Sequence, residues 1–157
     1  GEVCVKGAAV IKGYLNRPEA TAETIVDGWL HTGDIGYFDE EGFLYLVDRA
    51  KDMILRGGEN IYGAEVEFAV FDHPAVLECV AFAVPDERFG EEVGVAIHLK
   101  DGAMLDASGL REHLSTRLAA FKVPKYIWFL AEQLPRNANG KFLKRELREV
   151  LDPASAD

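Results

Sequence analysis

The chain has 157 residues, of which 48% are hydrophobic and 10% aromatic, which is enough for one ordinary domain or two small ones. These proportions exclude a disordered chain, and the formal net charge of −10 argues against general nucleic-acid binding, which needs a basic surface. No apolar run approaches the roughly 20 residues of a membrane span, and no signal peptide opens the sequence. We therefore expect a cytoplasmic protein.

The first 50 residues are expected to be rich in β-strand. Strands are expected at 1–7, 35–38 and 43–47, a short helix with proline in its first turn at 18–25, a polar turn at 31–34, and a hairpin turn at 39–42. The sequence begins abruptly at Gly1 without an initiator methionine. We expect Gly1 to be a cut point within a longer chain.

The charged segment at 48–52 lies between two apolar runs and indicates a linker or hinge. After it we expect a glycine-tipped hairpin at 53–62, a helix at 64–71, strands at 77–84 and 93–99, a helix marked by Leu110, Leu114 and Leu118, a strand at 127–130, and a final helix marked by Leu143, Leu147, Val150 and Leu151. This order describes a compact α+β unit of about 105 residues.

Cysteines and histidines show no metal-binding or disulfide spacing. Cys4 and Cys79 lie far apart and form no Cys-x-x-Cys pattern. The four histidines, which share no ligand spacing, are His31, His73, His98 and His113. We therefore expect no disulfide scaffold, no zinc knuckle and no metal held by the chain's own residues.

Basic residues gather near the end of the chain. Residues 122–148 hold seven basic and two acidic side chains, so this segment carries +5 and the rest of the chain −15. The basic ones are Lys122, Lys125, Arg136, Lys141, Lys144, Arg145 and Arg148. Such a tract on an acidic protein favours a small polyanion over a polymer, and a solvated surface is the alternative reading.

Two polar motifs occur in the N-terminal part of the chain, one inside the predicted β-rich segment and one at its end. In Thr32-Gly33-Asp34 the carboxylate can accept both hydroxyls of a ribose, although aspartate is also a plain turn former. In Asp48-Arg49-Ala50-Lys51 the arginine can hold a nucleotide in one domain arrangement and release it in another. A linker charged for solubility is the alternative for this second motif.

Two further motifs carry glycine. In Arg56-Gly57-Gly58-Glu59-Asn60 the adjacent glycines let backbone approach a ligand closely, or they serve a hairpin tip that needs positive φ. Residues 134–141 form a flexible polar loop that can carry Lys141 to a developing negative charge, or a loop without function. This loop lacks the leading glycine and the Ser/Thr of a Walker motif.

Taken in this order, the motifs resemble the C-terminal part of the adenylate-forming enzymes, the superfamily of acyl-CoA synthetases, peptide-synthetase adenylation domains and luciferases. The matching segments are 28–34, 48–52, 56–61, 64–67 and 135–141. The resemblance implies a mobile C-terminal domain at 51–157, a small mixed α/β domain with a β-hairpin and helices packed on a short sheet. Residues 1–50 are then the terminal β-rich part of a large N-terminal adenylation domain.

The resemblance also implies a reaction. A carboxylic acid attacks ATP to give an acyl-adenylate, the small domain rotates, and a thiol displaces AMP to give a thioester. We expect an ATP-dependent acid–CoA ligase for a fatty or other lipophilic acid, with CoA and the acid as small-molecule partners and Mg²⁺ accompanying ATP on ligands outside this chain. The absent N-terminal domain is the implied protein partner, and the chain alone is expected to be inactive.

The family's functional residues map onto this sequence one by one. Lys141 is implied as the adenylation lysine, Asp34 and Arg49 as nucleotide ligands, and Lys51 as the hinge. The implied CoA-binding residues are Gly57, Gly58, Glu59, Phe89, Phe121, Lys122 and Lys125. Two positions depart from the family pattern: Val123 is uncharged where some relatives have Arg, and Asn139 stands where Thr is common.

Three other readings stay open from the sequence. The acid is an aryl acid in the first. In the second the chain comes from an adenylation domain that loads a carrier protein. In the third it is a free-standing module that binds CoA or a nucleotide without catalysis.

Overall fold

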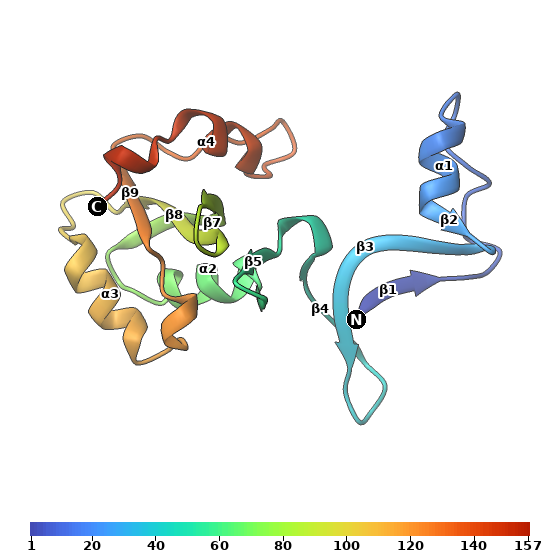
Figure 1. Cartoon of the computed structure of the whole chain (residues 1–157), viewed down its shortest axis with the longest axis horizontal. Coiled ribbons are helices and arrows are strands. Elements are labelled where there is room, and N and C mark those ends of the chain that lie inside the picture. The colour runs from blue at the N-terminus through green and yellow to red at the C-terminus, as the bar shows by residue number, and fades with distance from the viewer. The chain divides into compact units, whose positions relative to one another are not determined.

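The computed structural model describes residues 1–157, which divide into two compact units, Gly1–Lys51 and Asp52–Asp157 (Figure 1). The sequence places its boundary one residue earlier, between residues 50 and 51. None of the helices is long and apolar enough to cross a membrane.

The N-terminal unit is a four-stranded antiparallel sheet built around one long strand. Its elements are β1 (Glu2–Val5), α1 (Pro18–Thr24), β2 (Ile25–Val26), β3 (Trp29–Phe38) and β4 (Leu44–Arg49), followed by a 3-10 helix at Ala50–Asp52 that crosses the unit boundary. β3 pairs with each of the other three strands. The strand pairs leave the apolar side chains of this unit without a core. Tyr37, Phe38, Phe43, Leu44, Tyr45 and Leu46 are all exposed.

The predicted polar turn at 31–34 is wrong, because these residues lie inside β3. Cys4 pairs with His31 from one neighbouring strand and Arg49 pairs with Asp34 from another. Gly33 has φ +71, and the ladder accommodates this local irregularity without ending. Asp48 and Arg49 likewise belong to β4 and not to a linker, because cross-strand pairing was invisible in the local sequence.

The C-terminal unit is a five-stranded sheet covered by helices. Its elements are β5 (Ile54–Arg56), β6 (Glu59–Ile61), α2 (Gly63–Phe71), β7 (Val76–Asp86), β8 (Gly90–Leu99), α3 (Ala107–Ser115), β9 (Tyr126–Leu130) and α4 (Lys144–Val150), with 3-10 helices at Ala120–Lys122 and Pro153–Ser155. The strand order is β6-β5-β8-β7, and β9 joins β8 in parallel. The α+β architecture predicted from the sequence is confirmed.

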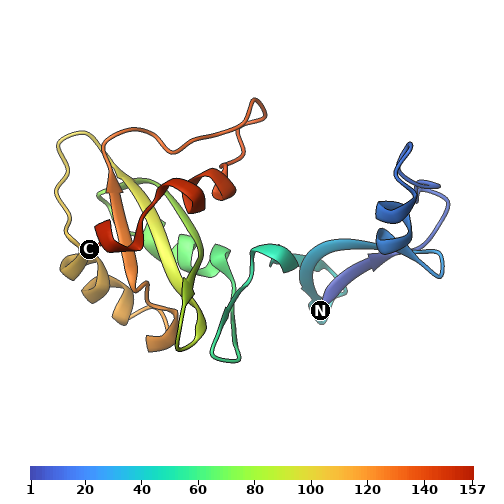
Figure 2. The same ribbon diagram turned by 45° about the horizontal axis from the view of Figure 1, so that its top comes forward.

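Both faces of this sheet are buried, which explains the unbroken apolar run in β7. Alternate residues of β7 and β8 face two separate clusters. One cluster includes Val66, Val95 and Leu114, from α2, β8 and α3, and the other includes Phe82 and Leu147, from β7 and α4. The ribbon accordingly shows α2 and α3 on one side of the sheet and α4 on the other (Figure 2).

Gly94 allows the second cluster to close. A Cβ at this position would lie 2.5 Å from Val84 Cγ2 and 2.9 Å from Trp128 Cζ3. Glycine at this position leaves room for the Trp128 ring, which stacks on Phe82 with ring centroids 5.6 Å apart. The unit therefore has a complete core of its own, unlike the N-terminal unit.

Candidate functional site

Asp34 and Arg49 form an ion pair across the β3–β4 ladder. They are directly opposed in the register, and Arg49 Nε donates to Asp34 Oδ1 at 2.9 Å. Arg49 Nη2 also donates to the Thr32 carbonyl at 3.1 Å, and the Asp34 N–H donates to the Thr32 hydroxyl at 3.0 Å. The sequence predicted both side chains as nucleotide ligands, and the structure brings them together with Asp34 Oδ2 outside the ion pair.

A shallow pocket of about 370 Å³ lies beside this pair within the N-terminal unit. Arg49, Ala50 and Lys51 form part of its wall, together with Glu2, Tyr14, Glu23, Thr24, His31, Thr32 and Gly33. The predicted hinge residue Lys51 is exposed and is the last residue of the unit. The pocket thus combines two cations, the carboxylates of Glu2 and Glu23, and hydroxyl groups.

In the C-terminal unit the two-glycine hairpin contacts the β7–β8 turn. Gly57 and Gly58 have φ of +56 and +95, and the Gly57 N–H donates to the Phe89 carbonyl at 2.9 Å. A Cβ on Gly57 would lie 2.9 Å from Phe89 Cδ1, whereas one on Gly58 would meet nothing within 4 Å. Both readings of this motif hold: the tip needs positive φ, and Gly57 also allows a close approach to Phe89. Glu59 pairs with Arg56 in the register of the same hairpin.

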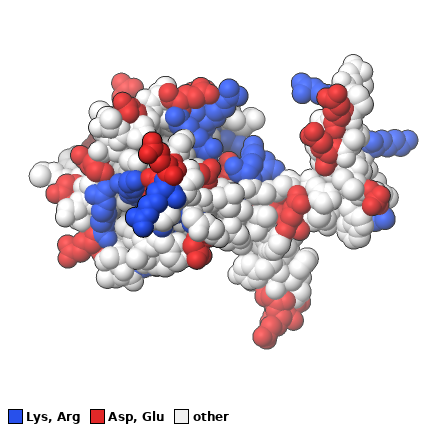
Figure 3. Space-filling view, in the orientation of Figure 1, with Lys and Arg blue, Asp and Glu red and all other residues white.

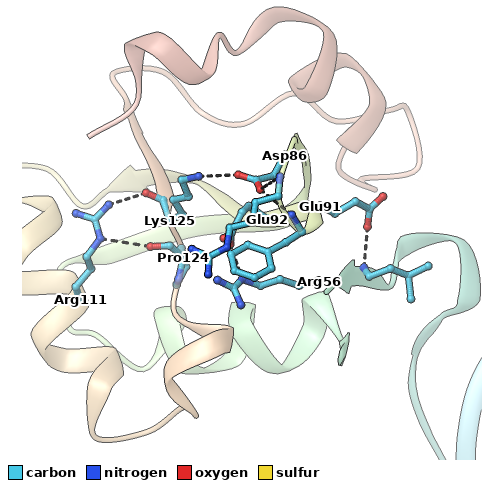
Figure 4. A network of polar contacts seen from close by, with 10 residues as sticks. Arg56, Asp86, Glu91, Glu92, Arg111, Pro124 and Lys125 are labelled. Carbon is cyan, nitrogen blue, oxygen red and sulfur yellow. Dashed lines mark hydrogen bonds and ion pairs between the residues drawn. The ribbon is translucent and has the colours of Figure 1, made fainter. Parts of the chain in front are cut away.

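Arg56 connects this hairpin to the sheet. Its guanidinium lies over the Phe89 ring, 4.0 Å from the centroid, and its Nε donates to Glu92 Oε2 at 2.7 Å (Figure 4). The Glu92 side chain is only 5% exposed, so its charge is buried and depends on this partner. The hydrogen bond to Glu92 raises the pKa of Arg56. The Phe89 ring is thereby fixed at the hairpin tip.

The same turn is joined to the segment before β9. Asp86 Oδ1 accepts the N–H groups of Arg88 and Phe89, both at 2.9 Å, and Oδ2 accepts Lys125 Nζ at 2.7 Å. The hydrogen bond from Lys125 is the main cause that lowers the pKa of Asp86 to about 2. Arg111 of α3 donates to the carbonyls of Pro124 and Lys125, which fixes the backbone of this segment (Figure 4).

Lys141 lies on a separate short hairpin, bridged between Arg136 and Phe142. Asn137 Oδ1 accepts the N–H groups of Asn139 and Lys141, both at 3.0 Å, so the loop is ordered by one side chain. Arg136 stacks on Phe142, 3.8 Å from the ring centroid, and donates to the Gly140 carbonyl at 2.9 Å. The result is a braced loop whose Lys141 side chain is exposed.

The basic tract does not form a free positive surface. Five of its seven cations are paired with carboxylates: Lys122 with Glu65, Lys125 with Asp86, Arg136 with Glu78, Lys144 with Glu67, and Arg145 with Glu149. One face of the C-terminal unit accordingly shows mixed acidic and basic side chains (Figure 3). Lys141 and Arg148 are the members of the tract without an ion pair. The prediction that the basic tract binds a small polyanion therefore depends mainly on these two residues.

The predicted CoA-binding residues fall into two groups. Gly57, Gly58, Glu59 and Phe89 meet at the hairpin, while Phe121 and Lys122 lie on the 3-10 helix at 120–122, where Lys122 Nζ is bound to both Glu65 oxygens at 2.7 Å. Lys125 connects to the hairpin group through Asp86 and the Phe89 N–H. Sequence reasoning missed the supporting carboxylates Glu78, Asp86 and Glu92, because nothing in their local sequence marks a partner.

Several known proteins are similar to this chain. The AMP-binding enzyme C-terminal domain family matches residues 65–141. A 2-succinylbenzoate–CoA ligase from Bacillus cytotoxicus is 51% identical over 97% of this chain and 31% of its own length. A long-chain-fatty-acid–CoA ligase from Bacillus subtilis is 52% identical over 95% of this chain and 26% of its own length.

A solved structure is also similar. The o-succinylbenzoate CoA synthetase of Bacillus subtilis, in complex with the acyl-adenylate intermediate OSB-AMP, has a TM-score of 0.86 and 42% identity, covering 94% of this chain and 30% of that one. The chain thus spans about three tenths of the length of the relatives that it matches.

Proposed function

We propose that the chain is the C-terminal part of an ATP-dependent carboxylic acid–CoA ligase, because its residues 65–141 match the AMP-binding enzyme C-terminal domain family. The single observation that carries the proposal beyond family likeness is the state of Lys141. It is a cation without an ion pair, on a loop braced by Arg136 and Asn137, within a tract where most cations are neutralised. Such a group is suited to charge that appears during a reaction.

Lys141 is proposed to act in the first half-reaction. A carboxylate oxygen of the acid attacks the α-phosphorus of ATP, the bond to pyrophosphate breaks, and an acyl-adenylate forms. Negative charge rises on the α-phosphate oxygens during this step, and the ammonium of Lys141 stabilises it there more than in the bound substrates. The exposed position of the lysine leaves it free to approach the reacting atoms.

Asp34 and Arg49 are proposed to hold the nucleotide. Asp34 Oδ2, outside the ion pair with Arg49, accepts a hydrogen bond from a ribose hydroxyl, while the guanidinium orients the carboxylate. Lys51 follows directly, at the boundary of the two units, and is the proposed hinge. The exposed apolar side chains of the N-terminal unit support the further proposal that it packs against the rest of a large domain.

In the second half-reaction the thiol of CoA loses its proton to solvent, the sulfur attacks the acyl carbon, and AMP leaves with the bonding electrons. The hairpin of Gly57 and Gly58 is proposed to line the path of the pantetheine arm, because backbone without Cβ atoms leaves room beside the fixed Phe89 ring. Lys125 is paired with Asp86 yet 48% exposed, so its remaining N–H donors can contact a CoA phosphate.

The acid is proposed to be a fatty or other lipophilic acid, with aryl acids as the second candidate. The two named ligases, one for 2-succinylbenzoate and one for long-chain fatty acids, match this chain equally well. Acid selectivity is therefore proposed to depend on residues outside the chain. The Mg²⁺ expected with ATP is placed outside it too, since Mg²⁺ prefers oxygen ligands and the one ligand-type cluster here includes a thiol and an imidazole.

The proposal is tested with the full-length protein that contains this chain. It is incubated with ATP, CoA and a panel of fatty and aryl acids, while pyrophosphate, AMP and thioester are quantified. Acid-dependent pyrophosphate release followed by CoA-dependent thioester formation is the expected result. CoA or nucleotide binding without turnover of any acid would favour the non-catalytic module, and transfer to a carrier protein in place of CoA would favour the carrier-loading domain.

A further inference from the structure

Three side chains of different metal-binding chemistry meet on neighbouring strands of the N-terminal unit. Cys4 of β1 and His31 of β3 are cross-strand partners, and Cys4 Sγ lies 3.6 Å from His31 Nδ1. Glu2 Oε2 lies 2.9 Å from the same nitrogen. One candidate ligand atom from each residue lies within 4.8 Å of the other two. We propose that Glu2, Cys4 and His31 bind a divalent transition metal ion of the Zn²⁺ class.

The two distances from His31 Nδ1 are close to those around a tetrahedral ion, while Cys4 Sγ and the Glu2 carboxylate lie within 4.8 Å of each other and would approach to about 3.5 Å. With Zn–S of about 2.3 Å and Zn–N of about 2.0 Å, tetrahedral angles place sulfur and nitrogen about 3.5 Å apart. The 3.6 Å between Cys4 Sγ and His31 Nδ1 matches this edge. The corresponding nitrogen–oxygen edge is about 3.3 Å, so the 2.9 Å between His31 and Glu2 must open by only a few tenths of an ångström.

The ligand set determines the class of ion. Thiolate, imidazole and carboxylate together suit Zn²⁺ or Co²⁺, whereas Mg²⁺ and Ca²⁺ prefer all-oxygen sites. Three protein ligands leave a fourth position open, as in zinc sites that exchange a bound molecule. Glu2 and His31 also line the pocket that contains Arg49 and Lys51. Water or an anion in that pocket is the expected fourth ligand.

The strand pairing holds the three groups in place without an ion. The second carboxylate oxygen of Glu2, Oε1, accepts the Gly33 N–H at 3.0 Å, which orients the carboxylate as outer-shell donors do in metal sites. The Thr32 hydroxyl donates to the Val3 carbonyl at 2.7 Å and keeps β1 beside β3. The side chains of Glu2 and His31 are 34% and 39% exposed, so an ion in solvent can enter.

Sequence motifs for metal ligands do not detect this site, because Cys4 and His31 lie 27 residues apart. The sequence analysis expected no metal site for that reason. The antiparallel ladder creates the cluster by placing one strand's cysteine opposite the other's histidine, with a bulge between Glu2 and Cys4 that changes the register there.

Cobalt provides a direct test, since Co²⁺ replaces Zn²⁺ and a Co–thiolate bond absorbs in the near ultraviolet. The full-length protein that contains this chain, freed of metal under reducing conditions, is titrated with CoCl₂. We expect a saturable thiolate-to-cobalt band at one ion per chain, bleached by excess ZnCl₂. The band disappears in Cys4→Ser and persists in Cys79→Ser, the matched control, because Cys79 is buried in the other unit.

Two further variants test the remaining ligands. Glu2→Gln and His31→Gln each raise the Kd for Co²⁺ by at least about tenfold, as loss of an outer-shell partner alone already does. A circular dichroism melt of each variant shows whether the N-terminal strands are retained. Absence of the thiolate band, its survival in Cys4→Ser, or an unchanged Kd in both glutamine variants would overturn the proposal.

Discussion

Arg136 and Glu78 lie 58 residues apart in the chain and form an ion pair of 2.9 Å that attaches the Lys141 hairpin to strand β7. Glu78 is 13% exposed and also accepts the Leu134 N–H at 2.9 Å. The Glu78 carboxylate thus holds the loop at two points, the backbone N–H of Leu134 and the side chain of Arg136. Lys141 takes no part in the Arg136–Glu78 ion pair, so substitutions can test the lysine and the ion pair independently.

Glu78→Gln tests whether the brace positions Lys141. The amide oxygen keeps an acceptor for Leu134, but the charge that holds Arg136 is lost, so the loop loosens while the fold is retained. In the full-length enzyme we expect acyl-adenylate formation to slow by up to about 100-fold, the scale of a catalytic group misplaced by about 1 Å. Thioester formation from supplied acyl-adenylate should not change. Equal slowing of both steps would reduce Glu78 to a structural residue.

Gly57→Ala is expected to impair the CoA step. The new Cβ would lie 2.9 Å from Phe89 Cδ1 at a backbone φ of +56, so the hairpin and the ring must move apart. Gly58→Ala is the matched control, because it shares the positive φ and meets nothing within 4 Å. Each substitution costs about 1 kcal/mol of stability through the backbone.

Steady-state kinetics distinguishes these two variants. Gly57→Ala should raise the KM for CoA or lower kcat in the thioester step more than Gly58→Ala does, with acyl-adenylate formation unaffected. Adding Phe89→Leu to Gly57→Ala should recover part of the loss by freeing space. Identical behaviour of the two alanine variants would remove the Phe89 contact from the account.

The Asp86–Lys125 pair predicts a loss of stability in acid. The pKa of Asp86 is lowered from an ordinary value of 3.8 to about 2, mainly by the hydrogen bond from Lys125. Between these values the unfolded chain binds a proton that the folded chain does not, so the stability from this group is complete above pH 4 and lost as pH falls towards 2. Chemical denaturation across this range should show a shallower decline for Asp86→Asn than for the parent chain. Parallel curves would contradict the pairing.

His73 predicts a second pH effect, in a higher range. Burial is the main cause that lowers its pKa below the ordinary value of 6.5, with His113 and Arg117 contributing repulsion. Its ring lies edge-on to His113, with centroids 4.8 Å apart, and its Nδ1 accepts the Ala75 N–H at 3.2 Å. The neutral form is thus the folded one, and its stability contribution is present above pH 6.5 and declines as pH falls below it.

Replacing His73 tests this assignment. His73→Asn keeps a side-chain acceptor for the Ala75 N–H and cannot be protonated in this range. The midpoint of urea unfolding should therefore change less between pH 7 and pH 5 in the variant than in the parent chain. An equal change in both would assign the pH dependence to other groups.

Periodicity and motif order predicted the elements of the C-terminal unit, although α3 ends at Ser115, before the predicted marker Leu118. Leu110 and Leu114 of α3 are completely buried, and the apolar strands 77–84 and 93–99 lie within β7 and β8. These signals are local, because a residue's face is set by its own helix or strand. The glycine-tipped hairpin was equally local, since Gly57 and Gly58 both have positive φ.

Relationships across strands were not predictable from the sequence. The segment 31–34 reads as a turn by composition, yet pairing on both edges makes it the centre of β3. The basic tract suggested a polyanion site, but the carboxylates that neutralise it come from distant elements, such as Glu65 of α2 and Glu78 of β7. Sequence shows which groups are present and leaves open which of them are already paired.

The role of Lys141 is tested most directly by Lys141→Ala in the full-length enzyme, with each half-reaction measured separately. Pyrophosphate release from acid and ATP should fall by at least about 100-fold, while thioester formation from supplied acyl-adenylate and CoA stays near the parent rate. Arg148→Ala is the control, because Arg148 is the other cation of the tract without an ion pair. Equal loss in both half-reactions, or an equal effect of Arg148→Ala, would contradict the assignment of Lys141 to adenylation.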